Sequence, residues 1–277
     1  MKICDLHNDI ITAQSFSNAI KYLQKKSKNI EKIVLAVWTT HSKINNYFDI
    51  QSIINRFETA NLNSRILFGI EDISAIDEKD YENISKLNLF YASLTWNYDN
   101  VLGGGAYGEK GLTNQGKTVL KIFEQNNIVL DTAHLNKRTF WDCYDNFNGH
   151  IICSHACFDA VRKHVRNLDD DQINAIISKN GVIGLALVGE FLTENYKAKI
   201  QDAARHIDYF VQKFGDSNLC LGTDFFGTEN LPENINDYTD LYLLVEYLEK
   251  IGYNKNAIEK IFYKNFVNFL EFINGNV

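Results

Sequence analysis

The sequence has no hydrophobic run long enough to cross a membrane. Its longest apolar stretches, such as GVIGLALVG at 181–189, fall well short of the ~20 residues that a spanning helix needs. The N-terminus, MKICDLHNDI, turns polar within its first residues, so we expect no signal peptide. We therefore expect a protein that works without a membrane partner.

The sequence also lacks an excess of positive charge and an even number of cysteines, which bears on its partners and its cellular compartment. Lys and Arg total 28 against 35 Asp and Glu, and the resulting net charge of -7 argues against a nucleic-acid partner, because phosphate binding needs a basic face. The five cysteines are an odd number, and Cys4, Cys153 and Cys220 lie inside apolar, strand-like runs. They are typical of buried thiols in a reducing compartment, which predicts a cytoplasmic protein without disulfides.

No Pro/Gly/Ser-rich linker, low-complexity tract or repeat divides the chain, so we interpret residues 1–277 as a single domain. Short apolar runs alternate with longer amphipathic stretches, which predicts βα units and a parallel sheet. Eight strands in this length suit a (β/α)8 TIM barrel, and a doubly wound open sheet is the alternative. The expected strands are Lys2–Leu6, Lys32–Trp38, Arg65–Ile70, Leu89–Thr95, Ile128–Asp131, Ile151–Ser154, Val182–Leu187 and Asn218–Gly222, and the clearest helices are Thr113–Gln125, Lys197–Phe214, Tyr238–Lys250 and Lys255–Ile273.

Potential metal ligands stand at the ends of five of these strands. In a β/α barrel the C-terminal ends of all strands open on one face, where active sites are built, so residues far apart in the sequence converge there. Three histidines and several carboxylates on that face suit zinc or a similar ion. The segments are Asp5-Leu-His7-Asn-Asp9, Glu71, Asp131-Thr-Ala-His134, Ser154-His155 and Thr223-Asp224.

The first of these segments also has a favourable spacing. His7 and Asp9 lie two residues apart, so on an extended chain both side chains project to the same side and can chelate one cation. Taken singly, each residue has a plainer interpretation, because an acid such as Glu71 commonly caps the next helix. We expect no functional role for the remaining histidines, which are His41, His150 and His164 in loops or at strand edges and His206 on a charged helix.

Nine short blocks resemble, in the same order, those of the membrane (renal) dipeptidase family of zinc metallopeptidases. They run from Asp5 to about Asn265, nearly the whole chain. Each block alone is unspecific, but nine in order make a strong match, and LTWN is a variant of a bacterial branch. The blocks are DLHND, FGIED, LTWN followed by LGGG, GLTNQGK, LDTAH, CSHA, VRNLDDDQI, GVIG and LGTDFFG.

The resemblance implies two zinc ions that share a bridging carboxylate. By resemblance, His7 and Asp9 would hold the first ion, His134 and His155 the second, and Glu71 would bridge them. Two dications about 3.5–4 Å apart need an anionic bridge, and metal-bound water can lose a proton near neutral pH. The implied reaction is attack of a metal-bridging hydroxide on a dipeptide or a similar small amide that bears a carboxylate.

Two further residues match functional positions of the family. Asp224 matches the acid/base residue that passes the nucleophile's proton to the leaving amine, with a helix cap or an orienting group as the alternative. Arg166 matches the arginine that binds the substrate carboxylate, since a guanidinium pairs with a carboxylate through two parallel hydrogen bonds. A surface arginine in a loop is the alternative there.

Two positions depart from the family pattern. Trp96 stands in LTWN where relatives with established dipeptidase activity carry a histidine that faces the scissile carbonyl, so an imidazole able to stabilise the oxyanion is missing. Val188 stands about where many relatives carry a tyrosine that contacts the substrate. We expect metal chemistry to survive both changes, with Trp96 contacting the substrate, while dipeptide specificity is in question.

Two stretches match phosphate-binding motifs without their structural context. Residues 111–118, GLTNQGKT, fit the P-loop pattern, but such a loop must leave a strand directly, and GGGAYGEK precedes it. Thr113 as a helix N-cap is the plainer account. Gly103-x-Gly105-x-x-Gly108 fits the dinucleotide fingerprint but leads into charge and another glycine, so we expect a flexible loop over the mouth of the active site.

These observations predict a cytosolic, zinc-dependent metallo-dipeptidase that acts on a small molecule, with a homodimer implied by the resemblance alone. A metal-dependent hydrolase of another amide, an ester or a lactam is the nearest alternative. A barrel that binds a small molecule without turnover is a second, and the filled ligand positions argue against it. A P-loop ATPase that depends on Lys117 is a third.

Overall fold

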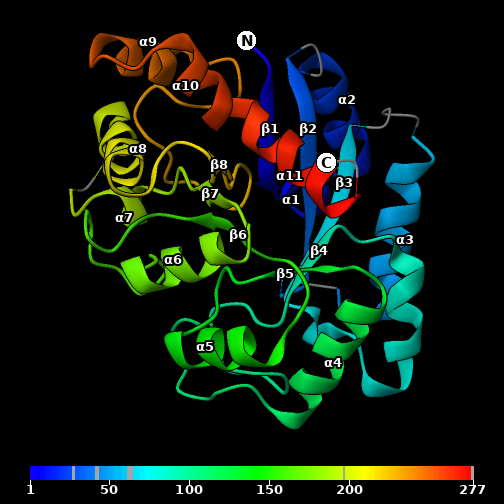
Figure 1. The fold of residues 1–277 in the computed structure, drawn as a ribbon. Helices are drawn as coiled ribbons and strands as arrows, with labels where there is room; N and C mark the ends of the chain where they lie inside the picture. Colours follow the sequence, from blue (N-terminus) through cyan, green and yellow to red (C-terminus); the bar gives the residue numbers. More distant parts are fainter. Residues whose placement is uncertain (27–28, 41–43, 61–64, 196, 276–277) are drawn as a thin grey trace.

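The computed structural model describes residues 1–26, 29–40, 44–60, 65–195 and 197–275. Eight parallel strands, paired in the order of the sequence, form a nearly closed barrel with helices around its outside (Figure 1). The strands are β1 (Ile3–Asn8), β2 (Ile30–Trp38), β3 (Ile66–Glu71), β4 (Tyr91–Ser93), β5 (Val129–Asp131), β6 (Ile151–Ala156), β7 (Ile183–Leu185) and β8 (Leu219–Leu221).

Helices connect successive strands and complete the β/α pattern. The α-helices are α1 (Ile10–Ala13), α2 (Phe16–Lys26), α3 (Tyr47–Glu58), α4 (Asn114–Gln125), α5 (Lys137–Asn146), α6 (Asp170–Ser178), α7 (Gly189–Leu192), α8 (Ile200–Phe214), α9 (Tyr242–Lys250), α10 (Lys255–Glu259) and α11 (Asn265–Ile273). Two 3₁₀ helices, η1 (Ile73–Ala75) and η2 (Glu78–Leu87), follow β3, and a π-helical turn, η3 (Lys260–Lys264), joins α10 to α11. Among the described residues, no helix combines the length and apolarity that crossing a bilayer requires.

The β/α barrel predicted from the sequence is confirmed, and each expected strand overlaps an observed one. Three strands run past their expected C-terminal ends: β1 continues to Asn8, β3 to Glu71 and β6 to Ala156, so His7, Glu71 and His155 lie within strands. The expected helix over Tyr238–Lys250 begins only at Tyr242, because the Tyr238 hydroxyl turns inward and donates a hydrogen bond to the buried Asp5 carboxylate.

The expected helix over Lys255–Ile273 contains a π-helical turn. Its wider winding brings Asn265 to β8, where the side-chain amide donates hydrogen bonds of 2.7 Å to the carbonyl oxygens of Asp216 and Leu219. These bonds satisfy carbonyl groups at the start of β8. The helical C-terminus is thereby fastened to the last strand of the barrel.

Apolar packing fills both sides of the strand ring. The larger core lies between the strands and the outer helices, and a smaller one fills the barrel interior, where Leu6, Val34 and Val129 meet Phe266 and Phe269 of α11. These interior residues lie toward the N-terminal ends of the strands, beside which α11 is seen in Figure 1. The barrel is therefore plugged at one end, and its polar residues are left for the other. All five cysteines are free and buried, as expected for a protein without disulfides.

The barrel closes between β1 and β8 through residues at their C-terminal ends. The backbone N–H of Asp9 donates to the carbonyl of Phe225 at 3.0 Å, and that of Asp224 donates to the carbonyl of His7 at 3.3 Å. The buried Asp5 carboxylate accepts from the N–H and the hydroxyl of Thr223 at 2.8 and 2.6 Å. His7, Asp9 and Asp224, whose backbone groups join β1 to the end of β8, are thus also residues that the sequence predicts for the site.

Candidate active site

The structure brings the predicted metal ligands together at the C-terminal ends of the strands, the face on which β/α barrels build active sites. Among the described residues, three groups of side chains have ligand atoms that lie within 4.8 Å of one another, and two of these groups together contain every predicted ligand. Every side chain is buried except that of Asp224, which is partly buried. These two groups are Glu71 with His134 and His155, and His7 with Asp9 and Asp224, and the third is His7 with Asp131 and His155.

The Glu71 carboxylate contacts both groups at once. Its Oε2 lies 3.0 Å from Nε2 of His7, and its Oε1 lies 3.2 Å from Nε2 of His134. Burial would raise the pKa of Glu71, but the contacts with these two imidazoles hold it well below its usual range. The next residue, Asp72, caps η1 by accepting from the N–H of Ser74. Helix capping therefore does not explain Glu71, and its ionised carboxylate spans the two groups.

The remaining contacts fit a site that binds cations. Oδ1 of Asp9 is buried without a hydrogen-bond partner, while its Oδ2 lies 3.1 Å from Nε2 of His7. The Nε2 atoms of His134 and His155 face each other at 2.9 Å. An unpaired buried carboxylate oxygen and converging imidazole nitrogens are what a bound zinc would satisfy.

The electrostatics of His134 and His155 favour their neutral forms. Burial, followed by the charge of Arg166, lowers the pKa of His134 to about 4. Burial, followed by the charges of His7 and His134, lowers the pKa of His155 well below its usual value. Only a neutral imidazole offers a lone pair to a metal, so both side chains are in the state that binds one.

Hydrogen bonds at the opposite ring nitrogens orient two of the imidazoles. Nδ1 of His134 lies 2.8 Å from Oδ1 of Asn97, and an amide oxygen only accepts, so the proton of this ring sits on Nδ1. Nδ1 of His7 lies 2.8 Å from the Tyr91 hydroxyl inside the barrel. Both contacts leave Nε2 directed at Glu71, as partners behind metal-binding histidines commonly do.

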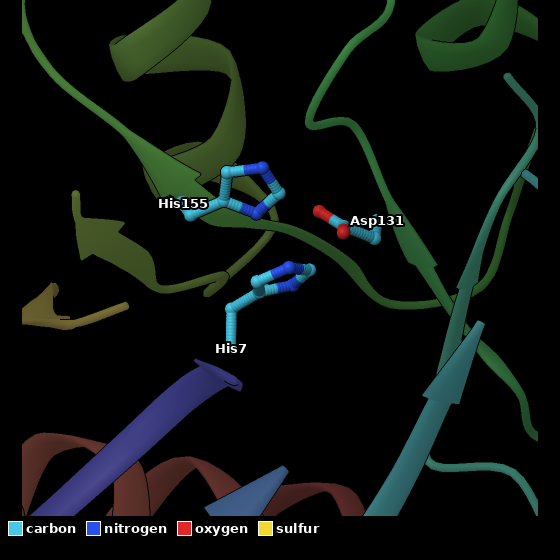
Figure 2. Close-up of side chains that lie close together, drawn as sticks. All are labelled: His7, Asp131 and His155. Carbon is cyan, nitrogen blue, oxygen red and sulfur yellow. The ribbon is translucent and has the colours of Figure 1, made fainter. Parts of the chain in front are cut away.

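A serine hydroxyl orients the third imidazole. Figure 2 shows the Asp131 carboxylate turned toward the rings of His7 and His155, which come from β1 and β6. Oγ of Ser154 donates its single proton to Oδ2 of Asp131 at 2.5 Å and therefore accepts from Nδ1 of His155 at 2.8 Å. The same Oγ lies 3.4 Å from Nδ1 of His7. Asp131 thus contacts the site through a hydroxyl that lies at Nδ1 of His155 and not at its Nε2.

Asp224, which belongs to the group of His7 and Asp9, has a constrained backbone conformation. Its Oδ1 lies 3.9 Å from Nε2 of His7, and its φ of 60° falls in the left-handed region that non-glycine residues rarely adopt. His134, with a φ of 68°, shares this feature. Such conformations cluster at functional sites because the surrounding structure must hold them. Burial, followed by the charge of Asp9, raises the pKa of Asp224 well above its usual value.

Gly227 makes room for the carboxylates of Asp9 and Asp224. A Cβ at this position would lie 2.2 Å from Oδ1 of Asp224 and 2.3 Å from Oδ2 of Asp9. Its backbone N–H donates to the carbonyl of Asp224 at 3.1 Å, which completes the tight turn after β8. Only glycine allows the chain to pass this close to the two side chains.

Arg166 is a buried arginine and not the surface residue that the alternative interpretation proposed. It is 5% exposed, and its Nη2 lies 2.9 Å from Nε2 of His155. Its guanidinium lies 5.3 Å from the ring centroid of Phe191, which follows β7. The Nε atom is buried without a partner. A full positive charge therefore stands at the edge of the metal-ligand cluster.

A cavity of about 160 Å³ opens over this cluster. The carboxylates of Asp9 and Glu71 reach it, whereas His7 and His155 lie fully buried beneath it. Both positions that depart from the family pattern contribute to its wall. The lining residues are Asp9, Trp38, Glu71, Trp96, Asn97, Tyr107, His134, Arg166, Val188, Glu190, Phe191, Asp224, Gly227 and Thr228.

The phosphate-binding motifs have other roles. Thr113 is the N-cap of α4, with its hydroxyl accepting from the N–H of Gly116 at 3.0 Å, and the preceding strand ends at Ser93. The P-loop interpretation is therefore wrong and the N-cap is confirmed. The loop that contains Gly105 packs so closely that a Cβ there would lie 2.2 Å from the carbonyl oxygen of Trp96, and it brings Tyr107 to the cavity.

Of the other histidines in the part of the chain that the structure describes, none belongs to these groups. His206 is fully buried in α8, where Nδ1 accepts from the N–H of Phe158 at 3.1 Å and Nε2 contacts the carbonyl oxygen of Leu192 at 3.2 Å. It joins two loops and is not exposed on a charged helix face. His150 and His164 are partly buried, and His41 lies outside the described residues.

The roles of Tyr91 and Gly227 were not predicted from the sequence. In the strand predicted over Leu89–Thr95, alternation places Tyr91, Ser93 and Thr95 on one face, and three hydroxyl groups in an apolar run are a signal for a polar interior face. No such signal exists for Gly227. A glycine is required at this position because the carboxylates of Asp9 and Asp224, which lie far apart in the sequence, approach its backbone.

Comparisons with known sequences find a family match that spans nearly the whole chain. Residues 2–275 match the family model of the membrane dipeptidases, peptidase family M19. An uncharacterized protein encoded near pqqA in Klebsiella pneumoniae is 28% identical over 203 residues, which cover 67% of this chain and 74% of that protein. An uncharacterized dipeptidase of Schizosaccharomyces pombe is 27% identical over 209 residues, which cover 70% of this chain but only 49% of that protein.

Solved structures share the whole fold at low sequence identity. A dipeptidase of family M19 superposes with a TM-score of 0.86 at 20% identity, over 98% of both chains. A metallopeptidase from Rhodobacter sphaeroides, liganded with a phosphinate mimic of L-Ala-D-Ala, superposes with a TM-score of 0.82 at 18% identity, over 98% of this chain and 99% of that one.

These matches confirm the resemblance drawn from the nine sequence blocks, since the family model spans nearly the entire chain. They also confirm the predicted enzyme class, a metallo-dipeptidase-like hydrolase on a TIM barrel. The chain therefore belongs to the membrane dipeptidase family, peptidase family M19.

Proposed function

We propose that residues 1–277 form one catalytic domain, a binuclear zinc hydrolase that cleaves dipeptides or similar small amides bearing a carboxylate. The observation that carries this proposal is the Glu71 carboxylate, which contacts His7 with one oxygen and His134 with the other. A dipeptide substrate is supported by the Rhodobacter sphaeroides relative, whose ligand mimics L-Ala-D-Ala. The free, buried thiols support a reducing cytoplasmic setting, and the homodimer follows from the family resemblance alone.

In this proposal His7 and Asp9 would hold one ion, His134 and His155 would hold the other, and Glu71 would contribute to both. Zinc, when bound, supplies a Lewis acid that lowers the pKa of water and polarises a carbonyl group. The orienting contacts of Tyr91, Asn97 and Ser154 keep the Nε2 lone pairs directed at the ions. The chain itself then has to bind the substrate, orient it and move one proton.

In this proposal Asp224 moves the proton. Its carboxylate lies beside His7 and Asp9, where it can accept a proton from the nucleophile and return it to the leaving amine. Burial and the charge of Asp9 favour its protonated form, and bound cations would oppose this effect by stabilising the carboxylate. Such a balance suits a group that must take up and release a proton in each turnover.

In this proposal Arg166 holds the substrate carboxylate. Its guanidinium is buried at the edge of the cavity, where a charge-assisted contact is stronger than it would be in water. A substrate carboxylate on Arg166 would place the neighbouring amide over the metal-ligand groups. Arg166 thus fixes the direction in which a dipeptide lies.

The test is metal content together with a substrate panel. Purified, zinc-loaded protein is expected to hold close to two zinc ions per chain and to hydrolyse members of a panel of L,L and L,D dipeptides. Glu71→Ala should lose more zinc than His134→Ala, because Glu71 contacts both groups. Asp72→Asn is the matched control, since this neighbouring residue caps η1 and belongs to neither group.

Three outcomes would contradict the proposal in different ways. Turnover confined to β-lactams, esters or N-acyl amino acids would keep the metal chemistry and reject the dipeptide. Tight binding of dipeptides with neither zinc nor turnover would indicate a barrel that only binds small molecules. Equal zinc loss in Glu71→Ala and His134→Ala would reject the bridge.

A further inference from the structure

The ends of the cavity differ in chemistry, and the barrel topology places them opposite each other. Arg166 contacts His155 of β6, whereas Trp38 is the last residue of β2. In a ring of eight strands paired in sequence order, β2 and β6 face each other across the barrel. The metal-ligand groups, including Glu71 at the end of β3, lie at the strand ends between them.

Aromatic rings make up the end of the cavity opposite Arg166. Trp38 and Trp96 flank the end of β3, with their ring centroids 5.5 Å apart, and Tyr107 joins them on the cavity wall. Trp96 also lies 6.1 Å from His134, so this aromatic wall borders the metal-ligand groups directly. We use the name aromatic wall for Trp38, Trp96 and Tyr107.

The aromatic wall is held in place but is not covered. The N–H of Tyr107 donates to the carbonyl of Asn97 at 2.8 Å, which ties the loop to the residue after Trp96. Both indoles are only partly buried, and Tyr107 is 53% exposed, although all three residues line the cavity. Uncovered aromatic surface inside a cavity gains free energy when an apolar group displaces its water.

We propose that the aromatic wall is the subsite for the side chain of the substrate's N-terminal residue, and that it selects large apolar or aromatic side chains. This inference rests on the proposed function, because a carboxylate on Arg166 directs the other end of a dipeptide across the metal-ligand groups toward β2 and β4. Aromatic side chains suit the wall, since rings attract each other in tilted or offset arrangements at centroid distances of about 4.5–7 Å. A methyl side chain would leave most of the wall in contact with water.

The same inference accounts for the tryptophan at position 96. An indole in place of an imidazole removes a hydrogen-bonding group beside His134 and adds apolar surface facing Trp38. The exchange gives up polar contact with the scissile group and strengthens contact with a neighbouring side chain. Trp96 is therefore a specificity-determining residue and not a degenerate catalytic one.

The test compares dipeptides that differ only in the N-terminal residue. With zinc-loaded protein, kcat/KM for Phe-Ala is expected to exceed that for Ala-Ala by at least about tenfold, with Leu-Ala in between. Trp38→Ala should reduce this ratio toward one, mainly by raising KM for Phe-Ala, because the lost contact is the same in ground and transition states. Tyr242→Ala, which removes a 54% exposed ring on α9, is the control and should leave the ratio unchanged.

Binding of phosphinate mimics of Phe-Ala and Ala-Ala tests the wall without turnover. Tighter binding of the Phe mimic by wild type, and its loss in Trp38→Ala, would support the subsite even if another reaction were found. Three outcomes would overturn the proposed subsite. They are equal kcat/KM for Phe-Ala and Ala-Ala, a preference for Lys or Arg at the N-terminal position, and a ratio that Trp38→Ala does not change. Those results would leave the proposed function standing, whereas absent zinc and absent hydrolysis of every dipeptide would reject the function itself.

Discussion

Replacing Gly227 by alanine is expected to damage the site far more than the fold. The new Cβ would lie 2.2 Å from Oδ1 of Asp224 and 2.3 Å from Oδ2 of Asp9, where ordinary contact begins at 3.4 Å. One side or the other must therefore move by about 1 Å, and a displacement of that size near reacting groups can cost about 10²-fold in rate. We expect kcat to fall by roughly 10²-fold and the ion held by Asp9 to bind more weakly.

The assay is kcat on the best dipeptide, zinc per chain and the melting temperature, each measured for wild type and Gly227→Ala. Gly215→Ala is the control, because Gly215 has a φ of 84° at the end of α8 and no atom within 4 Å of its Cβ position. That variant should lose about 1 kcal/mol of stability through backbone strain and keep its activity. Wild-type kcat and zinc content in Gly227→Ala would refute the placement of both carboxylates.

Further predictions concern proton transfer, substrate binding and acid stability. Asp224→Asn should lower kcat by roughly 10²–10⁴ with zinc retained, and loss of zinc would instead mark Asp224 as a ligand. Arg166→Met should weaken substrates with a free carboxylate by about 10- to 100-fold while leaving C-terminally amidated analogues nearly unaffected, as steady-state kinetics would show. Burial lowers the pKa of His206 to about 4 from an ordinary value of 6.5, so the unfolded state takes up the proton first as the pH falls. This contribution to stability is complete above pH 6.5 and is lost toward pH 4, by up to about 3 kcal/mol. Urea unfolding of the metal-free protein at about pH 7.5 and about pH 5 should show a smaller pH dependence for His206→Gln than for wild type, and equal dependence would exclude His206 as its source.

The strands were predictable because their apolar runs are separated by amphipathic stretches, but their ends were not. The sequence does not show whether a histidine at the end of an apolar run lies within the strand or after it. What allows His7 to lie within β1 is the Tyr91 hydroxyl, and what allows His155 to lie within β6 is the Ser154 hydroxyl. These partners are recognised only once the strands are placed around the ring.

The convergence of the possible metal ligands was predictable from residue type at strand ends, whereas the burial of Arg166 was not. Its sequence neighbours indicate a loop before a helix, and the contacts that bury it come from His155 and Phe191, which lie in separate βα units. Tyr238 shows the same limit. Its side chain fits a helical pattern, but a hydrogen bond to Asp5, 233 residues away, keeps it out of the helix.

The seam between β1 and β8 has a consequence for how the molecule loses its metal. Thr223 and Asp5, which are joined by hydrogen bonds, are separated by 218 positions in the sequence. The backbone hydrogen bonds beside them involve His7, Asp9 and Asp224. An ion held across this seam binds only the closed ring, so it stabilises closure by mass action. Removing zinc should therefore speed amide hydrogen exchange first at Asp9 and Asp224, before the strands on the far side of the ring respond. The bound ion would then stabilise the closed barrel in addition to its role in catalysis.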